Sequence, residues 1–129
     1  MAVILDTNAI SAIFAGDEGV ASVIDGAVRH HLPAIVLGEY RYGLKRSRKR
    51  RNLELLLDRL EEQSIVLVID GVTARHYADV REALRKQGRP IPENDVWIAA
   101  LAIQHRQPIV SRDAHFDVVE GVKRISWAG

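Results

Sequence analysis

The chain has no cysteine among its 129 residues. Neither disulfide bonds nor thiolate metal ligands can therefore hold the protein together. Segments without Asp, Glu, Lys or Arg reach only about ten residues, well short of the roughly twenty that cross a bilayer. The N-terminus also lacks a basic segment followed by an apolar run and a small-residue cleavage site, so we expect no signal peptide. The resulting expectation is a cytoplasmic protein.

Internal repeats, low-complexity tracts and long linkers are missing as well. The length suits one domain with a substantial core and is too short for two. Hydrophobic residues make up 47% of the chain and charged residues 27%, a balance typical of globular proteins. We therefore expect a single domain over residues 1–129.

Short apolar segments alternate with helical patterns along the chain. The segments that we predict as strands are residues 2–5, 32–36, 64–69, 108–111 and 122–127. Apolar residues spaced i, i+3, i+4 and i+7 predict helices around residues 20–27, 53–60, 77–84 and 94–105. Asp17 is a suitable N-cap for the first of these helices, and Gly88 and Pro90 end the third. This alternation predicts an α/β fold with a mostly parallel sheet of about five strands and helices on both faces.

The basic residues are unevenly distributed. Seven of the 18 lie between Arg41 and Arg51, where there is no acidic residue, and the other 11 are set against 17 acidic residues. A positive segment in an otherwise acidic chain indicates contact with a polyanion. A solvated helix–loop–helix surface explains the same pattern equally well.

Four acidic residues stand where an apolar strand ends or an apolar helix begins. Asp6 ends the first predicted strand, and Glu39 is expected in the first turn of the helix that follows residues 32–36. Asp95 opens the helix over residues 94–105, on the same face as its apolar stripe. Asp113 follows residues 108–111 by two positions. Because active sites of parallel α/β sheets lie beyond the carboxyl ends of the strands, we expect these four side chains to meet there.

Each of these acids also has a purely structural explanation. Asp95 is a possible helix N-cap, and Asp6 can accept hydrogen bonds from the amides of the next helix. Glu39 suits the positive end of a helix dipole, and Asp113 can cap a turn. These alternatives account for the residues one at a time but not for their convergence at one edge of the sheet.

A cluster of ionised carboxylates requires a cation. At an effective dielectric constant of about 20, two carboxylates some 6 Å apart repel each other by roughly 3 kcal/mol. A group of four must therefore be partly protonated or hold cations. Oxygen ligands without His or Cys favour Mg²⁺ or Mn²⁺ over Zn²⁺, and such a site suits hydrolysis of phosphodiester bonds.

At these residues the sequence resembles PIN-domain ribonucleases, and among them the VapC toxins of type II toxin–antitoxin systems. The matching segments stand in the family's order and cover nearly the whole chain: "ILDTNAISAIF", "LPAIVLGEYRYGL", "NDVWIAALAI" and "SRDAHFDVVEGVKRI". The resemblance implies a three-layer α/β/α PIN-like domain and a Mg²⁺-dependent endoribonuclease, with Mn²⁺ as a possible substitute.

The resemblance also implies residue roles. Asp6, Glu39, Asp95 and Asp113 form the acidic catalytic site. Asp6, Asp95 and Asp113 hold the metal, whereas Glu39 orients or deprotonates the attacking water.

Further positions match supporting roles in the family. Asn8 and Ser111 correspond to small polar residues that support the carboxylates. Asp117 matches a position where some members carry a further acid, but it is equally compatible with the surface. We expect His115, in "AHF", to pack within its loop rather than to act as a base.

The resemblance implies partners too. Relatives form homodimers and toxin–antitoxin hetero-oligomers, in which a cognate VapB-type antitoxin neutralises the toxin. The basic residues that would hold RNA phosphates or meet acidic residues of the antitoxin are Lys45, Arg46, Arg48, Lys49, Arg50 and Arg51.

Four other interpretations remain, and one of them, a structural or interaction protein, is favoured only by the basic segment. A phosphatase with Asp6 as nucleophile is disfavoured because Asn8 stands where the haloacid-dehalogenase pattern has a second Asp. A non-catalytic RNA-binding or regulatory module would retain the fold without turnover. A PIN-like nuclease can also process RNA for housekeeping rather than act as a toxin.

Overall fold

The computed structural model describes residues 1–127 as an α/β domain. Five strands form one parallel sheet in the order β3-β2-β1-β4-β5 within this described range. The strands are β1 (Ala2–Leu5), β2 (Arg29–Pro33), β3 (Ile65–Leu67), β4 (Ile109–Val110) and β5 (Arg124–Ile125). The predicted α/β class, parallel pairing and strand number are confirmed.

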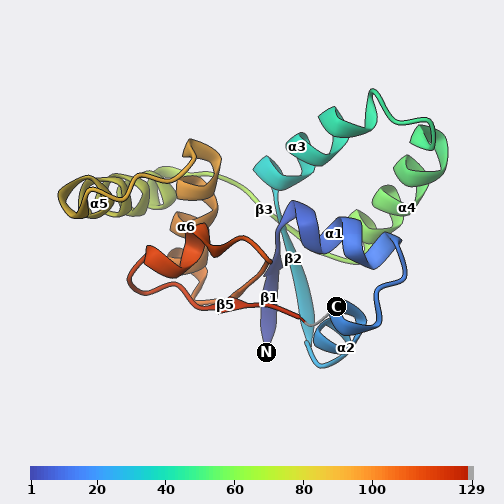
Figure 1. Ribbon diagram of the computed structural model, residues 1–129, viewed down its shortest axis with the longest axis horizontal. Coiled ribbons are helices and arrows are strands. Elements are labelled where there is room, and N and C mark those ends of the chain that lie inside the picture. Colours follow the sequence, from blue (N-terminus) through green and yellow to red (C-terminus); the bar gives the residue numbers. More distant parts are fainter. Residues whose placement is uncertain (128–129) are drawn as a thin grey trace.

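Helices flank the sheet on both sides in Figure 1, with α5 and α6 on one side and α1 and α2 on the other. The helices are α1 (Thr7–Phe14), α2 (Glu18–Asp25), α3 (Ala34–Leu44), α4 (Arg50–Glu62), α5 (Gly71–Gln87) and α6 (Glu93–His105), and a 3₁₀ helix, η1 (Ala114–Val118), follows β4. No helix among residues 1–127 is both long and apolar enough to cross a membrane.

Several predicted helix boundaries are confirmed. The Asp17 side chain accepts a hydrogen bond from the Val20 amide at 3.1 Å and caps α2. Gly88 ends α5 in the left-handed conformation, with φ of 67°, which glycine adopts without steric cost. Proline follows two residues later, where a helix cannot continue.

The prediction of a strand over residues 32–36 is wrong at both ends. The strand β2 begins earlier, at Arg29, and ends at Pro33, and α3 begins at Ala34. A continuous apolar run fits a buried helix as well as a buried strand, so its composition does not show where one ends. As a consequence, Glu39 lies in the middle of α3 rather than in its first turn.

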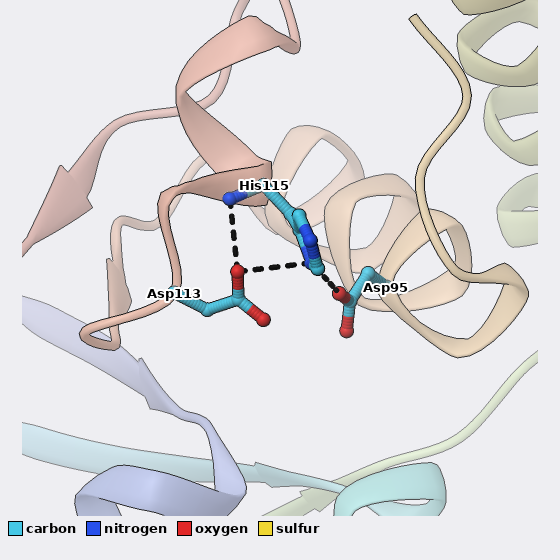
Figure 2. Close-up of side chains that lie close together, drawn as sticks. All are labelled: Asp95, Asp113 and His115. Carbon is cyan, nitrogen blue, oxygen red and sulfur yellow. Dashed lines mark hydrogen bonds and ion pairs between the residues drawn. The ribbon is translucent and has the colours of Figure 1, made fainter.

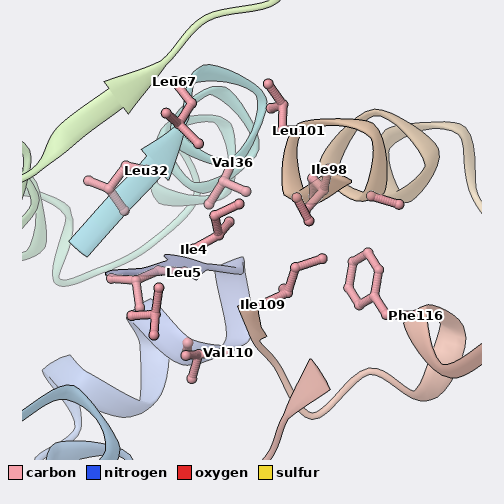
Figure 3. Close-up of a cluster of buried hydrophobic side chains, with 14 of the residues drawn as sticks. Ile4, Leu5, Leu32, Val36, Leu67, Ile98, Leu101, Ile109, Val110 and Phe116 are labelled. Carbon is pink, nitrogen blue, oxygen red and sulfur yellow. The ribbon is translucent and has the colours of Figure 1, made fainter. Parts of the chain in front are cut away.

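The core lies between the sheet and the helices (Figure 3). Ile4 and Leu5 of β1 and Ile109 of β4 are fully buried, as are Ile98 of α6 and Phe116 of η1. Fully burying one such side chain stabilises the fold by about 1.5–3 kcal/mol. This packing fixes the ends of β1 and β4 side by side, since Leu5 is paired in register with Val110.

Candidate metal centre

The four predicted acids meet at one cavity. Asp6, Glu39, Asp95 and Asp113 all line an open cavity of about 450 Å³ beyond the carboxyl ends of β1 and β4. They come from the end of β1, from the middle of α3, from the first turn of α6 and from the residues after β4. The prediction that these residues converge is therefore confirmed.

Asp6 is the most deeply placed of the four, with 4% of its surface exposed. Its carboxylate accepts a hydrogen bond from the Thr7 amide at 2.8 Å and so caps α1. It also accepts one from the Ser111 hydroxyl at 2.7 Å. Burial nevertheless raises the pKa of Asp6 above its ordinary value, although both hydrogen bonds act in the opposite direction. The capping role and the role in the acidic cluster therefore coexist in one side chain.

Ser111 and Asn8 tie the two strand ends together. The Ser111 hydroxyl, which donates to Asp6, accepts hydrogen bonds from the Asn8 side-chain amide at 3.2 Å and from the Asp113 backbone amide at 2.9 Å. The Asn8 side-chain oxygen in turn accepts from the Arg112 amide at 3.1 Å. Both residues thus hold the carboxylates in place, as the sequence predicts for small polar residues here.

His115 lies between Asp95 and Asp113 (Figure 2). Its Nδ1 is 3.0 Å from a carboxylate oxygen of Asp95 and 2.9 Å from one of Asp113, and its side chain is 49% exposed. The His115 backbone amide also donates to Asp113, which caps η1. The hydrogen bond to Asp95 is the main cause that raises the pKa of the imidazole.

This placement corrects the expectation that His115 packs within its loop. Phe116 fills that role and is fully buried. A 3₁₀ helix has three residues per turn, so successive side chains point in different directions. In η1 Phe116 is buried while the half-exposed His115 lines the cavity, a difference that the letters "AHF" do not reveal.

Asp95 and Glu39 complete the wall of the cavity. Asp95 is in the first turn of α6, whose N-cap is Pro92, so the N-cap explanation for Asp95 is wrong. Burial raises the pKa of Asp95, and the nearby charges of Asp6 and Asp113 add to the effect. Burial likewise raises the pKa of Glu39, against a hydrogen bond from Asn94 and together with the charges of Asp6 and Asp95.

The donor set fits a divalent cation. Asp95, Asp113 and His115 each offer one ligand atom, and these atoms lie within 4.8 Å of one another. Carboxylate oxygens are the ligands that Mg²⁺ and Mn²⁺ prefer, and Asp6 adds a third carboxylate to the same cavity. Burial and repulsion between neighbouring carboxylates both disfavour the ionised form of the acids here. A bound cation would favour the ionised form and so offset both effects.

Asp117 and the basic segment 45–51 lie outside the cavity. Asp117 forms a two-point ion pair with Arg124, with both contacts at 2.8 Å, and does not line the cavity. Arg124 lowers the pKa of Asp117. The basic segment 45–51 forms the turn between α3 and α4 and the start of α4, where Arg50 pairs with Glu54.

Comparison with known proteins agrees with this arrangement. Residues 3–122 match the PIN domain family. The chain is 31% identical to a protein of Sinorhizobium fredii named VapC ribonuclease Y4jK, over 86% of each chain. Among solved structures it is similar to FitAcB from Neisseria gonorrhoeae, with 30% identity, a TM-score of 0.79, and coverage of 95% of this chain and 96% of that one. A chain of VapBC2 from Rickettsia felis, solved bound to a promoter DNA fragment, shares the fold with a TM-score of 0.89 at 22% identity, and the match covers 99% of this chain and 100% of that one.

Proposed function

The chain belongs to the PIN-domain family, and on that premise we propose that it is a Mg²⁺-dependent endoribonuclease that acts as the toxin of a type II toxin–antitoxin pair. The observation that carries the proposal is the convergence of Asp6, Glu39, Asp95 and Asp113 on one cavity. The name of the S. fredii relative supports ribonuclease activity. The similar structure of VapBC-5 from Mycobacterium tuberculosis, described as a member of the VapBC family of toxin-antitoxin systems, supports the toxin role.

The residues that line the cavity have different proposed roles. Asp6, Asp95 and Asp113 are the proposed metal ligands. When bound, the divalent cation supplies positive charge that stabilises the transition state of phosphodiester hydrolysis and favours ionisation of the nucleophilic water. Ser111 and Asn8 keep two of these carboxylates in place through the hydrogen bonds described above.

Glu39 is the proposed general base. It faces the same cavity from α3, and its raised pKa makes it a better proton acceptor than an ordinary carboxylate. The side chain would take a proton from the attacking water and hold it within the cavity. Asn94 lines the same cavity and acts against the rise in the pKa of Glu39.

The proposal extends to the protein's localisation and partners. We propose a single cytoplasmic domain that forms a homodimer and is neutralised by a VapB-type antitoxin. Asp117 is assigned to the fold rather than to the reaction because its carboxylate is committed to Arg124. The basic segment 45–51 would contact RNA or the antitoxin.

The test is cleavage of total cellular RNA by the purified, antitoxin-free protein. Wild type should produce discrete fragments with Mg²⁺ or Mn²⁺ and none with EDTA. Asp6→Asn should be inactive, whereas Asp117→Asn, a matched change of an acid outside the cavity, should cleave as wild type does. Absence of cleavage by folded wild type would favour a non-catalytic RNA-binding module instead. A single processed product without growth inhibition on expression would favour housekeeping RNA processing.

A further inference from the structure

One face of α3 stays uncovered beyond the carboxylate cavity. Figure 1 shows α3 running from near the start of α6 toward the turn that joins α3 to α4. The exposed α3 stripe is defined as Gly38, Glu39, Tyr42 and Gly43 of α3 together with Arg46, which lies in the turn after the helix. Glu39 and Tyr42 are three positions apart, a spacing that places them along one side of α3, and Arg46 joins them through its contact with Tyr42.

Tyr42 is an unusual residue for this position. Its side chain is 67% exposed, one helical turn from Glu39, which lines the cavity. Arg46 lies against it, with the guanidinium carbon 5.7 Å from the ring centroid and Nη2 donating to the Tyr42 hydroxyl at 3.3 Å. The guanidinium is attracted to the ring, and the exposure of Tyr42 leaves ring surface accessible for stacking.

Packing does not explain why the stripe carries glycine at two positions. A Cβ on Gly38 or Gly43 would meet no atom within 4 Å, apart from chain neighbours and the local helix backbone. Glycine destabilises a helix interior relative to alanine. The two glycines therefore leave the backbone of α3 without side chains at these positions and lower the stability of the helix. Bare backbone on both sides of an exposed aromatic ring provides room for a flat ligand to approach closely.

Charge identifies the ligand class. The stripe begins at the candidate metal centre and ends at the basic segment 45–51, which carries six Lys and Arg residues. Exposed aromatic rings interleaved with cations bind single-stranded nucleic acid, because bases stack on the rings while phosphates meet the cations. Along an α-helix, the rise from Glu39 to Tyr42 is about 4.5 Å, shorter than the span of a nucleotide.

We propose that the exposed α3 stripe is a subsite for single-stranded RNA, in which Tyr42 stacks on a base adjacent to the cleaved phosphate and Arg46 holds the next phosphate. The inference rests on the proposed ribonuclease function. Gly38 and Gly43 admit the strand against the helix. Tyr42 acts by binding and not in the chemical step.

The test measures binding separately from cleavage. A fluorescein-labelled, single-stranded RNA of mixed sequence is titrated with the inactive Asp6→Asn protein, and affinity is followed by anisotropy. Adding Tyr42→Ala should weaken binding about 5- to 150-fold, since that is the range for loss of one stacked base. Tyr42→Phe should retain binding because the ring face remains. Leu55→Ala, the matched control on α4 with a side chain that is 59% exposed, should leave binding unchanged.

Salt dependence separates stacking from charge. Tyr42→Ala should lower affinity by the same factor at every salt concentration, whereas Arg46→Gln should reduce the slope of log K against log salt by about 0.7. Gly43→Ala should raise the melting temperature and weaken RNA binding together, an opposition that a purely structural role does not produce.

Equal RNA affinity of the Tyr42→Ala and control proteins would overturn the inference and assign the stripe to a protein partner. A Tyr42→Ala protein with a reduced salt slope would also overturn it, since the ring would then act only by placing Arg46. Neither result would contradict the proposed ribonuclease function. That function has its own test and is contradicted if the wild-type protein does not cleave RNA.

Discussion

Ser111 donates a hydrogen bond of 2.7 Å to the buried carboxylate of Asp6, although the two residues are 105 positions apart in the chain. The contact exists because β1 and β4 are neighbours in the sheet and end at the same edge. It joins the first acid of the site to the loop that carries Asp113. The position of the whole acidic cluster therefore depends on a pairing of two short strands.

Replacing Ser111 with alanine should weaken both the fold and the site. The change leaves the Asp113 amide without its side-chain partner and leaves Asp6 with only the hydrogen bond from the Thr7 amide, and an unsatisfied buried group costs about 1–3 kcal/mol. It also removes a hydrogen bond that lowers the pKa of Asp6, so affinity for Mn²⁺ should fall. Urea unfolding and calorimetric titration measure the two effects. The control is Ser22→Ala, an exposed serine on α2, and equal effects of both changes would contradict the account.

Replacing Asp95 with asparagine should stabilise the metal-free protein at neutral pH. Burial and neighbouring acids raise the pKa of Asp95, which means that the ionised form is disfavoured in the folded state. Loss of the contact with His115 offsets only part of the gain, since the imidazole is half exposed. Thermal unfolding in EDTA measures the change. A large drop in melting temperature would mean that Asp95 is a structural residue rather than part of a site.

Stability of the metal-free protein should depend on pH in a defined direction. The folded-state pKa values of Asp6, Glu39 and Asp95 are raised above 3.8, 4.5 and 3.8, respectively. Between these ordinary values and the raised ones, the folded state binds more protons than the unfolded chain. The contribution of these groups to the free energy of unfolding therefore falls as pH rises through that interval. Added Mg²⁺ should stabilise the protein increasingly as pH rises.

His115 gives a second pH effect of the same sign. Its pKa is raised above 6.5 by its contacts with carboxylates, so its stabilising contribution is complete below 6.5 and is lost as pH rises through the folded-state value. Urea unfolding of wild type and His115→Gln in EDTA isolates this contribution. Parallel pH profiles for the two proteins above 6.5 would show that the contact has no thermodynamic effect.

Replacing the basic residues of segment 45–51 with glutamine should weaken RNA binding and flatten its salt dependence. Each phosphate contact that is lost removes about 0.7 from the slope for a single strand. Arg50 already pairs with Glu54, so Arg50→Gln alone should have the smallest effect among the single changes. Filter binding at several salt concentrations measures the slopes. An unchanged slope would assign the segment to the antitoxin or to solvent.

The sequence predicts the meeting of the four acids better than the bounds of the elements that carry them, while their catalytic and metal-binding roles stay predictions. Asp6 and Asp95 stand out because an acidic residue beside a run of buried apolar residues is rare unless it has a partner. Their immediate neighbours in the sequence are enough to show this pattern. The end of β2 was misplaced because Ala34, Ile35 and Val36 are apolar in a helix as they would be in a strand. The role of His115 depends on the turn of η1 and on the start of α6, two segments whose contact no local pattern encodes. The single-domain expectation over residues 1–129 stays a prediction.

Binding of a divalent cation by the acidic cluster is the central claim, and calorimetric titration of Mn²⁺ into the RNA-free protein tests it most directly. Wild type and Asp117→Asn should bind the ion with similar affinity, whereas Asp6→Asn and Asp113→Asn should bind it at least about tenfold more weakly, a difference of about 1.4 kcal/mol. Equal binding by all four proteins would place the ion elsewhere and contradict the account.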